Sequence, residues 1–138
     1  MLLLLQLSGL FTLALGITHV FMPILFDFDG AIPRDGAPLR PFRLWFYTYA
    51  TKRSDIRGIA RVMNHSVSFV LISIGIADLV SPIWAGRPGS RILIFWIAVW
   101  WFLRAACQLY LGKRRGDWWI LGWFSLLGVL HVLMWFRI

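Results

Sequence analysis

Acidic residues are scarce in this sequence of 138 residues, which contains six aspartates and no glutamate. It has no pair of carboxylates placed for catalysis, and no G-x-S-x-G, H-E-x-x-H or Walker motif. These absences remove the usual signatures of hydrolases and transferases. A binding or accessory protein is therefore the simpler prediction, although a site that uses a histidine as general acid or base carries no fixed motif.

Cysteine is equally rare, because Cys107 is the single one in the chain. An intrachain disulfide is therefore impossible, and cysteine usage says nothing about the redox compartment. The chain also has no internal repeat with a period of roughly 20–50 residues, which argues against a solenoid or an array.

Apolar residues are abundant: 59% of the side chains are hydrophobic and the mean hydropathy is +0.73, against ~45–50% apolar residues in an ordinary soluble domain. They gather in four runs of about 20 residues, the length of a membrane-spanning helix. We predict an all-α integral membrane protein, a single domain over residues 1–138 with four transmembrane helices in an antiparallel bundle. The approximate spans are 2–23, 59–80, 92–111 and 118–136. A cleaved signal peptide is the competing interpretation of the first run, but no basic residue precedes it.

Four aromatic residues between the first two runs follow the i, i+3, i+4, i+7 spacing of a helix: Phe42, Trp45, Phe46 and Tyr49. This spacing predicts a short amphipathic helix that lies in the membrane interface. The alternative is a loop whose aromatic side chains pack on the bundle. Ser54 with Asp55, and Asp117, are the predicted N-caps of the helices that follow them.

Basic residues divide unequally between the two ends of the predicted bundle. Ten belong to the first and third connections: Arg34, Arg40, Arg43, Lys52, Arg53, Arg57, Arg61, Lys113, Arg114 and Arg115. The opposite side has three, Arg87, Arg91 and Arg137. Because cytoplasmic loops are enriched in lysine and arginine, both termini are predicted on the non-cytoplasmic side, most simply of a bacterial inner membrane.

Small and polar residues recur every three or four positions in the first two runs. The first run has Ser8, Thr12, Gly16, His19 and Pro23, and the second has Asn64, Ser68, Leu71, Gly75, Asp78 and Pro82. Such faces let two helices approach closely. We predict that these two faces are packing seams.

Five polar side chains on three of the predicted helices fall at one depth, near the cytoplasmic end: His19, Asn64, His65, Arg104 and Gln108. Arg104 and Gln108 are four residues apart and so share a helical face. A charged residue at membrane depth usually faces protein, water or a ligand. These five residues are the predicted ligand-binding site.

Three interpretations of this layer stay open. In the first, Arg104 and the histidines hold a phospholipid headgroup or a quinone, since the planar guanidinium favours oxyanions; Leu15, one turn before His19, is similar to part of a loose quinone-site pattern. In the second, His19 and His65 ligate a haem b, as in anchor subunits of membrane oxidoreductases, or one of them serves as acid or base in an intramembrane enzyme. In the third, Arg104 only snorkels to the headgroups. The layer contains no acidic ligand, so no metal site is predicted.

Asp78 and His131 form a second polar layer near the other end, roughly 20 Å away at 1.5 Å per helical residue. Asp78 is most simply a helix-end residue paired with Arg87 or Arg91, and the alternative is a buried pair with His131. His131 is more simply a packing histidine than a ligand. The predicted partners are membrane lipids and either a larger membrane complex or a second copy of the chain, with no nucleic acid.

Overall fold

The computed structural model describes residues 1–37, 39–110 and 115–138, and these are mostly helical. The chain divides into two compact units. The first unit joins Met1–Phe11 to Ile74–Ile138, and the second is Thr12–Ser73. The boundaries fall inside two long helices, each of which contributes to both units.

Four helices among the described residues are long and apolar enough to cross a membrane. They are α1 (Leu2–Val20), α4 (Arg53–Leu79), α6 (Ser90–Cys107), which continues into the 3-10 helix η1 (Gln108–Tyr110), and α7 (Arg115–Trp135). The four predicted runs are confirmed as helices. The second begins at Arg53 instead of near Ile59, and the predicted end of the third, Leu111, lies outside the described residues.

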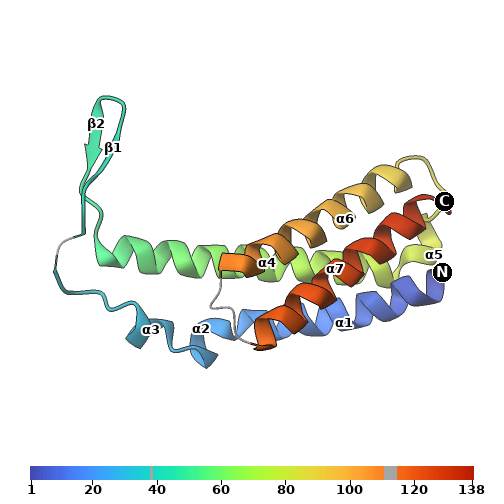
Figure 1. The fold of residues 1–138 in the computed structure, drawn as a ribbon, viewed down its shortest axis with the longest axis horizontal. Helices are drawn as coiled ribbons and strands as arrows, with labels where there is room; N and C mark the ends of the chain where they lie inside the picture. Colours follow the sequence, from blue (N-terminus) through green and yellow to red (C-terminus); the bar gives the residue numbers. More distant parts are fainter. Residues whose placement is uncertain (38, 111–114) are drawn as a thin grey trace. The chain divides into compact units, whose positions relative to one another are not determined.

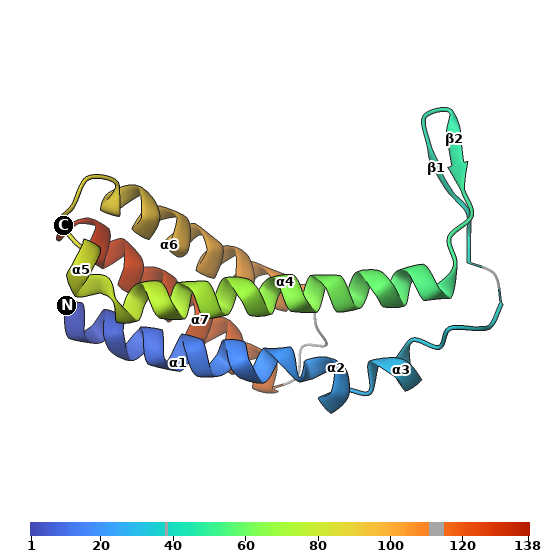
Figure 2. The same cartoon turned by 180° about the vertical axis from the view of Figure 1, so that it is seen from behind.

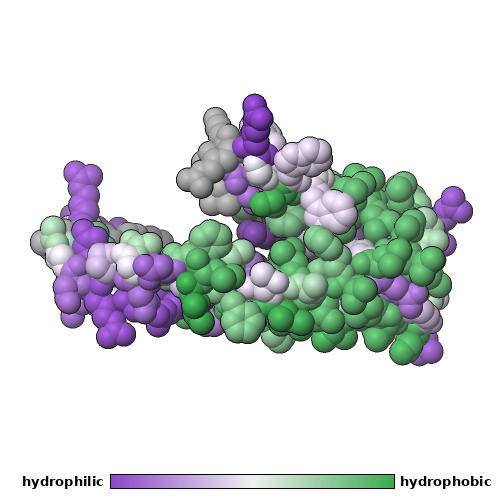
Figure 3. All heavy atoms as spheres, turned by 90° about the horizontal axis from the view of Figure 1, so that it is seen from below, coloured by the Kyte–Doolittle hydropathy of each residue, from purple (hydrophilic) through white to green (hydrophobic). Residues whose placement is uncertain are grey.

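The exposed surface of these helices is largely hydrophobic. Between 28% and 33% of each candidate span is buried, and Figure 3 shows green, hydrophobic side chains spread over the helices. Leu3, Phe69, Ile92 and Trp96 are each more than 60% exposed. A surface of this kind is suited to lipid or to another apolar partner.

In the first unit, α6 packs along α7 (Figure 1). Gly128 on α7 lies against the Phe102 ring on α6, since an added Cβ would be 2.9 Å from that ring. Leu5, Ile94 and Met134 form a buried hydrophobic cluster on three different helices. Because Ile94 meets the end of α7 and Phe102 meets its middle, the pair runs antiparallel.

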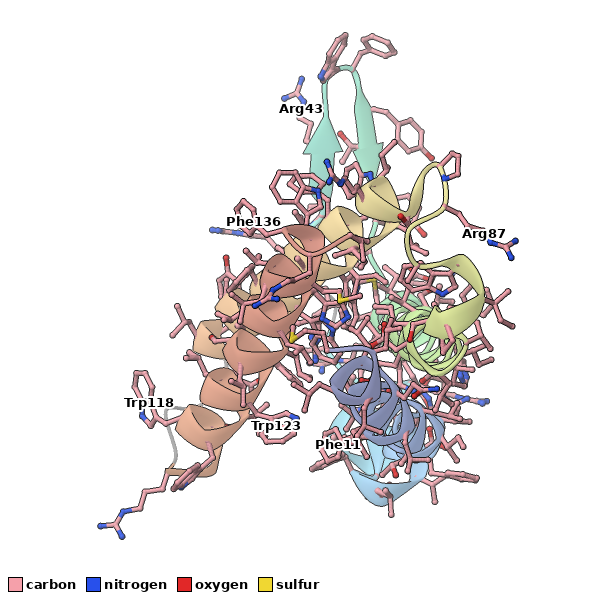
Figure 4. All side chains as sticks on the ribbon, turned by 90° about the vertical axis from the view of Figure 1, so that its right-hand side faces the viewer. Phe11, Arg43, Arg87, Trp118, Trp123 and Phe136 are labelled. Atoms are coloured by element: carbon pink, nitrogen blue, oxygen red, sulfur yellow. The ribbon has the colours of Figure 1, made fainter. Side chains whose placement is uncertain are left out.

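The start of α1 lies very close to the end of α4 in this unit. A Cβ added to Gly9 would come within 2.8 Å of the Gly75 carbonyl oxygen and of the Asp78 Cβ. Only a residue without a side chain permits this approach. Two residues further along α1 in the same unit, Phe11 and Trp123 face one another with ring centroids 5.0 Å apart (Figure 4).

The second unit begins with the rest of α1 and includes two single-turn helices, α2 (Met22–Leu25) and α3 (Phe28–Ala31). Gly16 repeats the close approach seen at Gly9, because an added Cβ would lie 2.9 Å from the Ile72 backbone nitrogen. Gly16 belongs to the seam predicted for the first run, and its close approach to α4 confirms that position. Gly9 makes the same kind of approach but was not among the predicted seam residues.

The predicted interfacial helix is wrong. The segment is a two-stranded antiparallel hairpin, β1 (Phe42–Leu44) and β2 (Tyr47–Tyr49), drawn in Figure 2. A two-residue loop connects the strands, and Trp45 in it has φ +54°. Aromatic residues and threonine favour strands, whereas one isolated helical turn has too few hydrogen bonds to offset its nucleation cost.

Both predicted N-caps are also wrong. Helix α4 begins at Arg53, and Asp55 reaches back from the first turn to accept a hydrogen bond from the Lys52 backbone N–H, at 2.9 Å. This is one half of a capping box. Asp117 lies in the first turn of α7, which begins at Arg115, where a carboxylate still stabilises the positive end of the helix dipole.

Outside the long helices, Asp29 holds the start of α4 to the segment before it. Its carboxylate forms ion pairs with Arg57 and Arg61. The Tyr49 hydroxyl donates a hydrogen bond to Asp55 at 3.1 Å. This hydrogen bond and the nearby negative charge raise the pKa of Tyr49 above its ordinary value, because both favour the protonated phenol.

Candidate functional site

In the first unit, Arg104 lies near the end of α6, where its side chain is half-buried. Its guanidinium carbon stands 5.6 Å from the centroid of the Phe124 ring on α7, within the range of a cation–π contact. Its Nε is buried and has no hydrogen-bond partner among the described residues. The ring therefore stabilises the charge but leaves one donor unused.

Trp101 lies one turn before Arg104 on the same face of α6. The side chain is fully buried and packs on Phe124, with ring centroids 5.3 Å apart. Its indole N–H also has no partner within the part of the chain that the structure describes. Two buried donors thus lie against one aromatic ring, and a buried donor without an acceptor costs about 1–3 kcal/mol. An oxygen acceptor would relieve that cost.

Gln108 follows one turn later in η1 and is 6% exposed. It lines a shallow hollow whose other walls are Leu109 and three residues at the start of α7: Asp117, Trp118 and Leu121. The hollow is too small for a headgroup. Of the three basic residues in the third connection, Lys113 and Arg114 lie outside the described residues and Arg115 begins α7.

In the second unit, His19 and Asn64 are brought together through Ser68. Ser68 donates its hydroxyl proton to the Asn64 carbonyl oxygen at 2.8 Å, so it accepts at 3.3 Å from the Nδ1–H of His19. The Asn64 side-chain amide in turn donates to the His19 carbonyl oxygen at 3.0 Å. The sequence marks Ser68 only as a seam residue and does not reveal its place between these two.

His65 does not join this group. Its neighbour Asn64 is buried, whereas His65 is exposed on α4. Successive helical residues point about 100° apart, so the seam that holds Asn64 turns His65 outward. Of the five predicted ligand residues, the structure joins His19 to Asn64 in one unit and places Arg104 and Gln108 along one stretch of the other. The common layer itself stays a prediction.

The second predicted pair, Asp78 and His131, lies entirely in the first unit and is in direct contact. Nε2 of His131 is 3.2 Å from both carboxyl oxygens of Asp78, and neither side chain is exposed. Ser8 donates to the same carboxyl at 3.4 Å. The preferred prediction, which paired Asp78 with Arg87 or Arg91, is wrong: both arginines are exposed, and Asp78 faces inward from the last turn of α4.

Metal binding has no support in the described residues, which contain no group of three or more histidine, cysteine or acidic side chains placed to hold an ion. Comparison of the chain with protein-family models, with curated proteins and with solved structures finds no match to any of them.

Proposed function

We propose that this chain is an integral membrane protein whose four long helices cross the bilayer as an antiparallel bundle. The support is the apolar, mostly exposed surface of each helix. The excess of basic residues in the first and third connections further favours a bacterial inner membrane with both termini on the non-cytoplasmic side.

Within that membrane, the proposed role is the binding of an amphiphile, either a phospholipid through its phosphate or a quinone through its carbonyl. The carrying observation is the pair of unused, buried donors, Trp101 Nε1 and Arg104 Nε. Both groups only donate, so they select an acceptor oxygen. The positive charge of Arg104, held over Phe124, favours an anionic acceptor or one that carries partial negative charge.

The alternative functions have less support. A haem b held by His19 and His65 requires both rings to face one site, but His19 is bonded to Ser68 and His65 is exposed. An acid–base enzyme at these histidines has no further observation in its favour. A role as an accessory subunit, in a larger complex or a homo-oligomer, agrees with the exposed apolar helices and with the same amphiphile site.

Native mass spectrometry of the protein, extracted from its own membrane in mild detergent, tests the proposal. The wild type should carry a reproducible small-molecule mass, and that mass separates phospholipid from quinone. Arg104→Leu should lose at least tenfold in retained ligand. Arg104→Lys should retain an intermediate amount, because the ammonium keeps the charge but not the fixed Nε–H donor.

Arg91→Leu is the matched control, since Arg91 lies on the same helix, is exposed and belongs to the opposite end. Its ligand retention should equal that of the wild type. Equal retention in Arg104→Leu would refute the binding site, and equal behaviour of Arg104→Lys in every assay would mean that Arg104 only snorkels. A mass that includes unrelated subunits would support the accessory role.

A further inference from the structure

The geometry around His131 fixes where its protons are. Its Nδ1 lies 2.8 Å from the Leu127 carbonyl oxygen, one turn back on α7. A carbonyl oxygen can only accept, so Nδ1 carries a hydrogen. A neutral imidazole has a single N–H, so in that form Nε2 has only a lone pair to offer.

That lone pair would point at a carboxyl group. Nε2 is 3.2 Å from both Oδ1 and Oδ2 of Asp78. If Asp78 were ionised and the ring neutral, a lone pair would face a carboxylate in a site with no exposure to solvent, where repulsion is scarcely screened. A second proton is therefore required between the two groups. It sits on Nε2, giving imidazolium and carboxylate, or on Asp78, giving a neutral acid and a neutral ring.

Other charged groups do not meet this requirement. At this end of the first unit the cations are Arg87, Arg91, Arg137 and the amino group of Met1, and all four residues are exposed. The described residues include no second ion pair to Asp78. Ser8, the neighbour on α1, supplies only a long hydrogen bond of 3.4 Å. The pair must obtain its proton from the aqueous phase.

We propose that Asp78 and His131 form a proton-binding site in the first unit, whose ligand is one exchangeable proton shared by the carboxyl and the imidazole. Proton uptake converts the Asp78 carboxylate and the neutral His131 ring, plus one proton from water, into the hydrogen-bonded pair. The bound state has no net charge and the empty state has one buried negative charge. Proton binding is thus coupled to the packing of α7 against the end of α4.

A second buried hydroxyl, that of Ser81, follows Asp78 in the chain. Ser81 follows Asp78 by three residues, at the start of α5 (Ser81–Trp84), and is fully buried. Its hydroxyl has no partner among the residues described here. A hydroxyl both donates and accepts, so it can relay a proton.

The protonation state can be read directly from the full-length protein in detergent, with ¹⁵N-labelled histidine. His131 is assigned as the signal that persists when His19 and His65 are both replaced by Asn. Two protonated ring nitrogens support the site. A ring protonated only at Nδ1 supports it when the infrared spectrum also shows a carboxylic acid C=O band that Asp78→Asn removes. A neutral ring without that band overturns it, whichever nitrogen carries the hydrogen.

Asp78→Asn is the matched variant, since its amide can donate to Nε2 and keep the contact without an extra proton. Thermal unfolding at pH 7.5 in weak buffer, followed with an indicator dye, should release about one proton per chain more from the wild type than from this variant, since a free carboxyl and a free imidazole are mostly deprotonated there. Equal release would also overturn the proposal. Replacements at Arg104 should leave the difference unchanged.

Discussion

Two histidines in this protein make interhelical contacts of opposite kinds. His19, in the second unit, donates its Nδ1–H to the hydroxyl oxygen of Ser68, and the neutral Nδ1–H ring and the charged ring both carry this donor. His131, in the first unit, lies between a carbonyl and a carboxyl, so its Nε2 faces the carboxyl with a hydrogen or with a lone pair according to the number of protons bound. One contact is independent of proton number and the other is not. The choice of partner, more than the histidine, decides whether a polar contact is also a proton-binding site.

Removing one member of the Asp78–His131 pair should have the largest effect on stability. His131→Leu should lower the free energy of unfolding by about 3–5 kcal/mol, because Asp78 stays buried without a partner. The double variant Asp78→Leu with His131→Leu should recover most of that loss, since apolar replacement of a buried pair is often close to neutral. Denaturant titration in detergent measures both. A double variant as unstable as the single one would show that packing volume, not the unpaired acid, sets the cost.

The glycines test the two units separately. Gly9→Ala and Gly16→Ala should each lower the free energy of unfolding by about 1–3 kcal/mol, since the new methyl group would overlap backbone atoms of α4. Only Gly9→Ala should also shift the His131 resonance, because Gly9 lies against Asp78. Gly122→Ala is the control: nothing lies within 4 Å of its Cβ, so stability should hold or rise. A shift of the His131 resonance in Gly16→Ala would contradict the expectation that only Gly9→Ala affects Asp78 and His131.

The contact of His19 with Ser68 should contribute much less to the free energy of unfolding. Ser68→Ala removes the hydroxyl that joins His19 to Asn64, and interhelical hydrogen bonds in membrane proteins average ~0.6 kcal/mol. We expect a loss of that size in the same denaturant titration, with no change in the number of protons released on unfolding. A loss as large as that of His131→Leu would mean that the two histidines are energetically alike.

The smallest effect lies in the hairpin. The pKa of Tyr49 is raised by its hydrogen bond to Asp55, so this contact stabilises the fold below the pKa of an unfolded tyrosine, ~10, and is lost as pH rises through the folded value. Asp55→Asn should lower the pKa of Tyr49 in a spectrophotometric titration, with Tyr49→Phe to identify its signal. Superimposable titrations of the wild type and Asp55→Asn would contradict this assignment.

The long helices could be predicted from the sequence because hydropathy over some twenty residues is a strong signal. The seams that contain Gly16 and Asn64 could be predicted as well, from the spacing of small and polar residues. The hairpin could not, because the eight residues from Phe42 to Tyr49 are too few to separate a helical from an extended pattern. Tertiary context and strand propensity decided it.

The candidate site was predictable only in part. Asp78 was assigned first to arginines near it in sequence, with His131 as the alternative, because His131 is 53 residues away and no spacing rule reaches across that separation. The sequence did not mark Trp101 as a polar site residue, because a tryptophan within an apolar run is predicted to be a packing residue. Its role depends on the buried N–H, which is visible only once the helices are in contact.

The sequence separations in the first unit also set an order of assembly during translation. Ser8 and Asp78 are 70 residues apart, and His131 follows Asp78 by a further 53. At ~5–20 residues per second, Asp78 emerges roughly 3–10 s before the histidine that completes its site. During that interval the growing chain contains Asp78 without the histidine that pairs with it in the folded unit. The nascent protein thus contains an incomplete polar cluster until its last helix is made, and a pause in synthesis between α4 and α7 would prolong that exposed state.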